Sequence, residues 1–127
     1  MSMGAGLSVL MAEDEWLAAE VLAEALADAG FTVLTAPDGL AALEMAAGGT
    51  RFDLLLTDLR MPRMDGRELI ARLRAERPDL PVVVMTGFPP PDGADALHGG
   101  KAPLRLLTKP VEIAPLVAAL RAVAGLT

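Results

Sequence analysis

Near its middle the chain reads FDLLLTD, residues 52–58, a stretch that contains the continuous apolar run LLLT and ends in a carboxylate. Runs that are apolar at consecutive positions are typical of strands in parallel sheets that helices cover on both faces. Two similar runs flank it, LSVLMA at residues 7–12 and PVVVMT at residues 81–86. We therefore predict a buried central strand at residues 52–58 and comparable strands on either side of it in the chain.

Amphipathic segments separate these runs, with apolar residues at the spacing of a helix. Asp38 is a suitable N-cap for one of them, and Gly30 and Pro78 follow two others at positions where helices commonly end. Helices are predicted at residues 16–29, 39–47, 68–76 and 111–124. Two further strands are predicted at residues 31–36 and 104–108.

Strict alternation of strands and helices predicts an α/β fold, a doubly wound five-stranded parallel sheet with right-handed crossovers. Residues 87–103 fit this alternation least well. Their Pro and Gly content leaves room for only about two helical turns, near residues 92–98.

Length and composition fit one aliphatic domain. The chain has 127 residues, 53% of them hydrophobic and only 3% aromatic, and it contains no Cys, which excludes disulfides and cysteine-ligated metal sites. No apolar run approaches the roughly 18 residues of a membrane span, and the first residues lack a basic signal-peptide start. We expect a soluble, cytoplasmic protein that is not bound to a membrane.

The net charge of −6 is concentrated at the beginning of the chain, because residues 1–28 hold six acidic residues and no Lys or Arg. Direct nucleic-acid contact depends largely on clustered Lys and Arg, so we expect none here.

Polar residues stand at the ends of four predicted strands: Glu13, Asp14, Asp58, Thr86 and Lys109. Ligands of doubly wound sheets bind beyond the carboxyl ends of the strands, so these side chains should meet at one edge. Three crowded carboxylates either acquire raised pKa values or bind a hard divalent cation, and Mg²⁺ is the natural candidate. Asp58 could then attack phosphorus to form an acyl phosphate, with Lys109 and Thr86 contacting the transferred group.

These residues lie in motifs that resemble the receiver domains of two-component response regulators. DLRMPRMDG at residues 58–66 is similar to the family's phosphoacceptor signature, and LMAEDE at 10–15 to its acidic pair, with Glu in place of the commoner first Asp. VVMTG at 83–87 resembles its hydroxyl-bearing strand, and TKP at 108–110 its lysine–proline step.

The resemblance implies a flavodoxin-like (βα)5 receiver fold over residues 7–124, between a disordered segment at 1–6 and a tail at 125–127. It implies a phosphoacceptor domain, not an enzyme in the usual sense, that receives a phosphoryl group on Asp58 and switches conformation. The donor would be a histidine kinase or a histidine phosphotransfer protein, and a downstream effector protein is a possible further partner.

The same resemblance implies the role of each site residue. Asp14 and Asp58 would coordinate Mg²⁺, Glu13 would act through water, and the backbone carbonyl of Arg60 would add a ligand. Thr86 and Lys109 would contact the phosphoryl oxygens. A cis peptide bond is implied before Pro110.

Two features depart from the family pattern. Leu106 occupies a position where receivers usually carry an aromatic residue that takes part in switching, and the Pro- and Gly-rich residues 88–103 replace most of the family's fourth helix. These departures keep a phosphorylation-independent binding module open as an alternative. A haloacid-dehalogenase-like phosphatase is another, although such enzymes usually carry a second Asp where this chain has Arg60.

Overall fold

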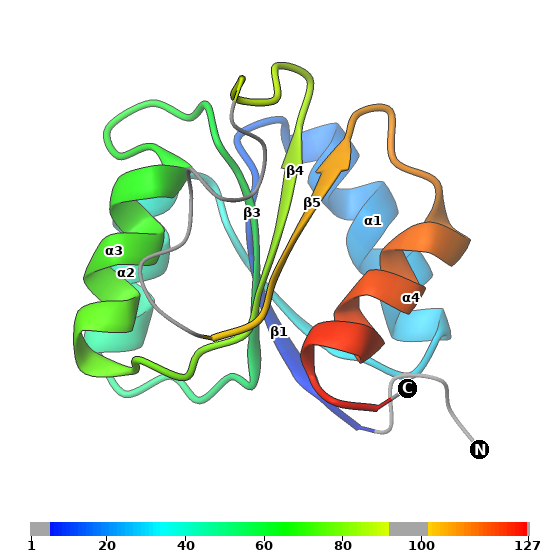
Figure 1. The fold of residues 1–127 in the computed structure, drawn as a ribbon, viewed down its shortest axis with the longest axis horizontal. Coiled ribbons are helices and arrows are strands. Elements are labelled where there is room, and N and C mark those ends of the chain that lie inside the picture. The colour runs from blue at the N-terminus through cyan, green and yellow to red at the C-terminus, as the bar shows by residue number, and fades with distance from the viewer. Residues whose placement is uncertain (1–5, 92–101, 127) are drawn as a thin grey trace.

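The computed structural model describes residues 6–91 and 102–126, so the helical turns expected at 92–98 lie outside the described residues. Five parallel strands form one sheet in the order β2-β1-β3-β4-β5 (Figure 1). They are β1 (Ser8–Ala12), β2 (Thr32–Ala36), β3 (Leu54–Asp58), β4 (Val82–Thr86) and β5 (Leu104–Thr108). The predicted doubly wound sheet is confirmed, and its strand order reverses direction between β1 and β3.

In the part of the chain that the structure describes, two helices cover each face of the sheet (Figure 1). The helices α1 (Trp16–Asp28) and α4 (Ile113–Val123) lie on one face, and α2 (Gly39–Ala47) and α3 (Gly66–Glu76) lie on the other. All four helices that the sequence predicts outside residues 87–103 are therefore present.

Local signals account for the helix ends. The Asp38 side chain accepts a hydrogen bond from the Ala41 N–H at 2.8 Å and so caps α2, as predicted. Gly30 follows α1 with a φ of 102°, in the left-handed region that favours glycine. The predicted start of α3 at residue 68 is wrong: the helix begins at Gly66, because Asp65 is its N-cap and accepts the Glu68 N–H.

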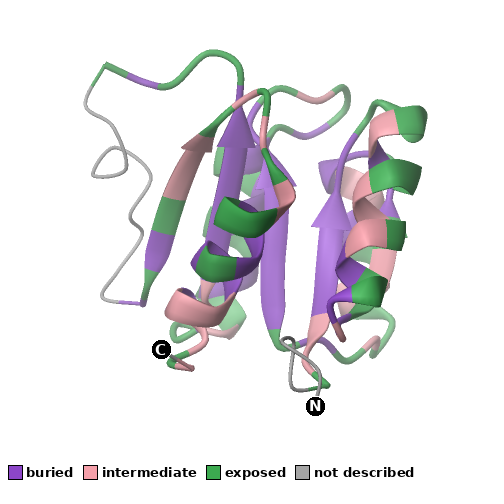
Figure 2. Cartoon of the chain, turned by 90° about the vertical axis from the view of Figure 1, so that its right-hand side faces the viewer, coloured by how far each residue is buried: buried purple, intermediate pink, exposed green. Residues whose placement is uncertain are grey.

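The core lies in two layers, one on each side of the sheet. All five residues of β3 and of β4 are buried, which explains their unbroken apolar sequences (Figure 2). Side chains alternate between the layers, so that Leu55 packs under α2 and α3 while Leu54 and Leu56 pack under α1 and α4. In contrast, β5 is an edge strand and exposes Arg105.

Within the described residues, no helix combines the length and apolar character that crossing a membrane requires.

Candidate functional site

Three carboxylates meet at the carboxyl end of the sheet. Glu13 and Asp14 follow β1, and Asp58 ends the adjacent β3, with Ala12 paired to Thr57 in the register of the two strands. One oxygen from each of the three side chains lies within 4.8 Å of the others. Glu13 and Asp58 are buried, whereas Asp14 is exposed.

Lys109 joins two of these carboxylates from the end of β5. Its Nζ lies 2.5 Å from Asp58 Oδ2 and 3.0 Å from Glu13 Oε2. The Lys109 backbone N–H donates to the Thr86 carbonyl at 2.8 Å, which fixes the residue just beyond the paired ends of β4 and β5. The peptide bond between Lys109 and Pro110 is cis, as the family resemblance implied.

Burial and ion pairing shift the pKa values of Glu13 and Lys109 in opposite directions. Burial raises the pKa of Glu13, although its bonds with Lys109 and the Glu15 N–H act in the other direction. Burial alone would lower the pKa of Lys109, but the bonds to Asp58 and Glu13 outweigh it and leave that pKa raised. Lys109 is therefore a fixed positive charge at neutral pH.

The second oxygen of Asp58 faces the loop that follows β3. Asp58 Oδ1 accepts the Arg60 N–H at 3.2 Å. The loop closes at Gly66, whose N–H donates to the Leu59 carbonyl at 2.8 Å. A Cβ atom at position 66 would overlap the Asp58 carbonyl oxygen, so this close approach requires glycine.

Thr86 ends β4, next to Asp58. Because Asp58 pairs with Met85, the Thr86 residue stands one position further toward the edge. Its hydroxyl is buried and accepts the Phe88 N–H at 3.1 Å. The Arg60 guanidinium lies 4.2 Å from the centre of the Phe88 ring. The segments that follow β3 and β4 are therefore in contact with each other at the carboxyl edge of the sheet.

Leu106, which stands where receivers usually carry an aromatic residue, is half-buried on β5 and packs against the core layer under α2 and α3. The Pro- and Gly-rich stretch at residues 88–103, which departs from the family pattern, is described only at its two ends, 88–91 and 102–103.

The donor set suits Mg²⁺, because carboxylate oxygens are the ligands that this hard cation takes and three of them converge here. Sequence reasoning named Glu13, Asp14, Asp58, Thr86 and Lys109, and the structure gathers all five at one edge of the sheet. Arg60 is also there: its N–H contacts Asp58, while its side chain turns away to Phe88.

Comparison with known proteins agrees with this architecture. The sequence model of the response regulator receiver domain matches residues 9–121. The chain belongs to this family. The match covers the sheet except Ser8, the first residue of β1, and all but the last two residues of α4, so the site described above is the carboxyl edge of a receiver domain.

Relatives and solved structures point the same way. The receiver domain is 41% identical over 82% of its length to a response regulator receiver protein of Anaeromyxobacter sp. and 38% identical over 92% to the transcriptional regulatory protein TcrA of Mycobacterium tuberculosis. It spans only 43% and 46% of those two proteins. The structure of the chemotaxis protein CheY4 of Vibrio cholerae matches with a TM-score of 0.82 and 30% identity, over 94% of this chain and 99% of that one. None of these matches favours the phosphatase or the phosphorylation-independent binding module.

Proposed function

We propose that this receiver domain accepts a phosphoryl group on Asp58 in a Mg²⁺-dependent reaction. The observation that carries the proposal is the contact of Lys109 Nζ with Asp58 Oδ2 at 2.5 Å, at the point where three carboxylates converge. A strand-end carboxylate paired to a lysine has both the nucleophile and the cation that phosphoryl transfer needs.

In the proposed reaction, a carboxylate oxygen of Asp58 forms a bond to phosphorus while the bond from phosphorus to the donor breaks. With a phosphohistidine donor the bond that breaks is P–N, and the imidazole nitrogen keeps the electron pair and takes a proton from solvent. The product is an acyl phosphate on Asp58. Lys109 would pair with a phosphoryl oxygen in place of its present contact, and the Thr86 hydroxyl would donate to another.

Glu13, Asp14 and Asp58 are the side chains that would hold Mg²⁺, with Glu13 acting through water and the Arg60 carbonyl as a backbone ligand. When bound, the ion would offset negative charge on the acceptor and the donor. Asp14 is exposed and so is accessible to a hydrated ion, whereas the buried Glu13 already has Lys109 as its partner.

Membership of the family supports a histidine kinase or a histidine phosphotransfer protein as the donor, and an effector protein as a further partner. We take residues 7–124 as the domain. Any catalysis by it would be limited to its own phosphorylation and dephosphorylation. Its cytoplasmic location stays a prediction.

Intact-mass measurement after incubation with acetyl phosphate tests the proposal. We expect the mass of one phosphoryl group to be added when Mg²⁺ is present and none when a chelator removes it. Asp58→Asn should abolish the adduct. Asp53→Asn is a matched control, because Asp53 lies just before the opposite end of β3, and it should be labelled like the native chain. Equal labelling of Asp58→Asn, or labelling without the metal, would contradict the proposal.

A further inference from the structure

The loop between β3 and α3 contains a strained backbone. Arg63 has a φ of 66°, and among residues 6–91 and 102–126 it is the one non-glycine residue with a positive φ. The Met64 N–H donates to the Pro62 carbonyl at 2.7 Å, which makes Arg63 the central residue of a γ-turn. A γ-turn with positive φ is the rare and strained form, and such strain persists only where the surroundings hold it.

The side chain of Arg63 supplies one such restraint. Its Nε donates to Asp38 Oδ2 at 2.7 Å and its Nη2 to Asp38 Oδ1 at 3.1 Å, a two-pronged contact that fixes direction as well as distance. Asp38 is itself buried and held in place, because it caps α2 through the Ala41 N–H. The strained turn is therefore tied to the first turn of α2.

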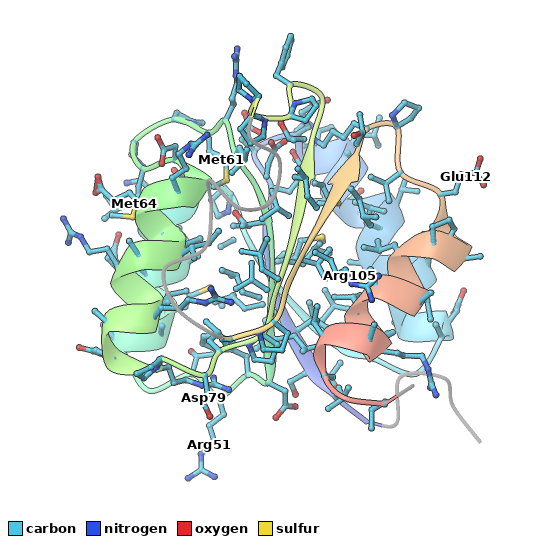
Figure 3. The ribbon with its side chains drawn as sticks, in the orientation of Figure 1. Arg51, Met61, Met64, Asp79, Arg105 and Glu112 are labelled. Atoms are coloured by element: carbon cyan, nitrogen blue, oxygen red, sulfur yellow. The ribbon has the colours of Figure 1, made fainter. Side chains whose placement is uncertain are left out.

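Packing adds to this restraint. A Cβ atom on Gly39, the first residue of α2, would overlap the Met64 carbonyl oxygen, so helix and loop are in direct backbone contact. Figure 3 shows Met61 and Met64 where the loop meets α3. Met64 is buried and Met61 packs against the same core layer, so core packing holds the loop on both sides of Arg63. The position of Arg63 itself depends on its contact with Asp38.

The same loop contains Arg60, which contacts the proposed phosphoacceptor Asp58. Arg60 lies three residues before Arg63, and its N–H already contacts Asp58 Oδ1.

 The base of this loop is closed by the hydrogen bond from the Gly66 N–H to the Leu59 carbonyl. With the base closed and the outer part tied to α2, the place of the Arg60 backbone relative to Asp58 depends on the turn at Arg63.

We propose that Arg63 is a positioning residue for the Mg²⁺ site: through Asp38 it holds the loop in the strained shape that places the Arg60 backbone beside Asp58. The inference rests on the proposed function, because it concerns the same site. Arg63 itself touches neither the carboxylate cluster nor the metal in this scheme. It acts on metal affinity through the backbone.

Three variants separate the contact from other effects. Asp38→Asn keeps the cap of α2, since Asn caps helices as well as Asp does, but it removes the negative charge that pairs with Arg63. Arg63→Met removes the guanidinium and keeps the aliphatic stem. Arg63→Gly removes the contact and also relieves the positive φ. Arg72→Met is the matched control, because Arg72 is an exposed arginine on α3 whose partner is Glu68.

The measurement is the dissociation constant of Mg²⁺ alone, from the amide NMR shifts of residues 58–66, together with the melting temperature without metal. We expect Asp38→Asn, Arg63→Met and Arg63→Gly each to weaken Mg²⁺ binding by about fivefold, less than the roughly 10–100-fold cost of losing a direct partner of a metal ligand. The double variant Asp38→Asn/Arg63→Met should be no weaker than either single one, because both remove the same contact. Arg72→Met should bind Mg²⁺ like the native chain.

A purely structural role for Arg63 would lower the melting temperature and leave the dissociation constant unchanged. The inference is overturned if the Asp38 and Arg63 variants bind Mg²⁺ within twofold of the native chain, or if Arg63→Gly alone retains native affinity. If the native chain itself shows no saturable Mg²⁺ shifts, the proposed function fails as well, so the two failures are distinguishable.

Discussion

Replacing Lys109 by methionine removes the one positive charge found beside the carboxylates in the described part of the site. The change keeps most of the aliphatic stem and deletes the ammonium that lies 2.5 Å from Asp58 and 3.0 Å from Glu13. Both carboxylates are buried, so without Lys109 they lose a partner that water replaces poorly. We expect the metal-free variant to be less stable than the native chain.

The magnitude follows from the burial of the three groups. Breaking a buried ion pair by removing one partner typically costs about 3–5 kcal/mol. The Lys109 side chain is 26% exposed, which weakens the native contact, and Glu13 can take up a proton in the variant, at about 1.4 kcal/mol for each unit between its pKa and the working pH. We therefore expect a loss of about 2–3 kcal/mol in the free energy of unfolding at pH 7.

The pH dependence has a definite sign. Burial already raises the pKa of Glu13 in the native chain, and loss of Lys109 removes a contact that opposes this rise. An acid whose pKa is higher in the folded state than in the unfolded state stabilises the fold as it takes up a proton. The deficit of the variant should therefore shrink as the pH falls from about 7 to about 5.

Urea unfolding followed by circular dichroism measures the deficit, since Trp16 is 70% exposed and is a poor probe of the core. Arg105→Met is the matched control: it removes an exposed cation from the same strand and should change stability by no more than about 0.5 kcal/mol. A deficit below about 1 kcal/mol at pH 7, or one that grows on acidification, would refute the reasoning.

Three further predictions concern the scaffold. Arg74 is buried and donates to three backbone carbonyls, so Arg74→Ala should lower the free energy of unfolding by about 2–4 kcal/mol in urea titrations, and a loss under about 1 would contradict this. Gly66→Ala should cost about 3 kcal/mol because its Cβ would overlap backbone, whereas Gly87→Ala, with open space around it, should be nearly neutral; equal losses would be the contrary result. Arg63 holds the pKa of Asp38 below its ordinary value, so this carboxylate contributes stability that is present above pH 3.8 and lost as the pH falls through its lowered pKa. Acid titration of Asp38→Asn should lack that loss, and a titration curve parallel to that of the native chain would argue against it.

Much of the fold is predictable from the sequence because local and global signals agree. Consecutive apolar residues in β3 reflect burial on both faces, and Asp38 and Gly30 mark helix ends in the usual way. The start of α3 is missed by two residues because the cap at Asp65 stands before a glycine, which has low helix propensity but packs against the Asp58 carbonyl. Tertiary contact here outweighs local preference.

The polar residues of the site are equally predictable, since each ends a strand and parallel strands bring their carboxyl ends to one edge. The Arg63 contact with Asp38 is not, because nothing in an arginine predicts a positive φ, and its partner lies 25 residues away. Arg74 is missed for a similar reason: a charged residue in a helix is expected to face water, and two of its three carbonyl partners, Ala102 and Pro103, lie 28 and 29 residues away.

The most direct test of the central claim is to locate the phosphoryl group on the chain. After incubation with acetyl phosphate and Mg²⁺, reduction with borohydride converts an aspartyl phosphate to homoserine, which peptide mass spectrometry then assigns to one position. We predict homoserine at Asp58 alone, with Asp14 and Asp53 unmodified. Homoserine at another aspartate, or a phosphoryl adduct that borohydride leaves unchanged, would contradict the assignment of Asp58 as the acceptor.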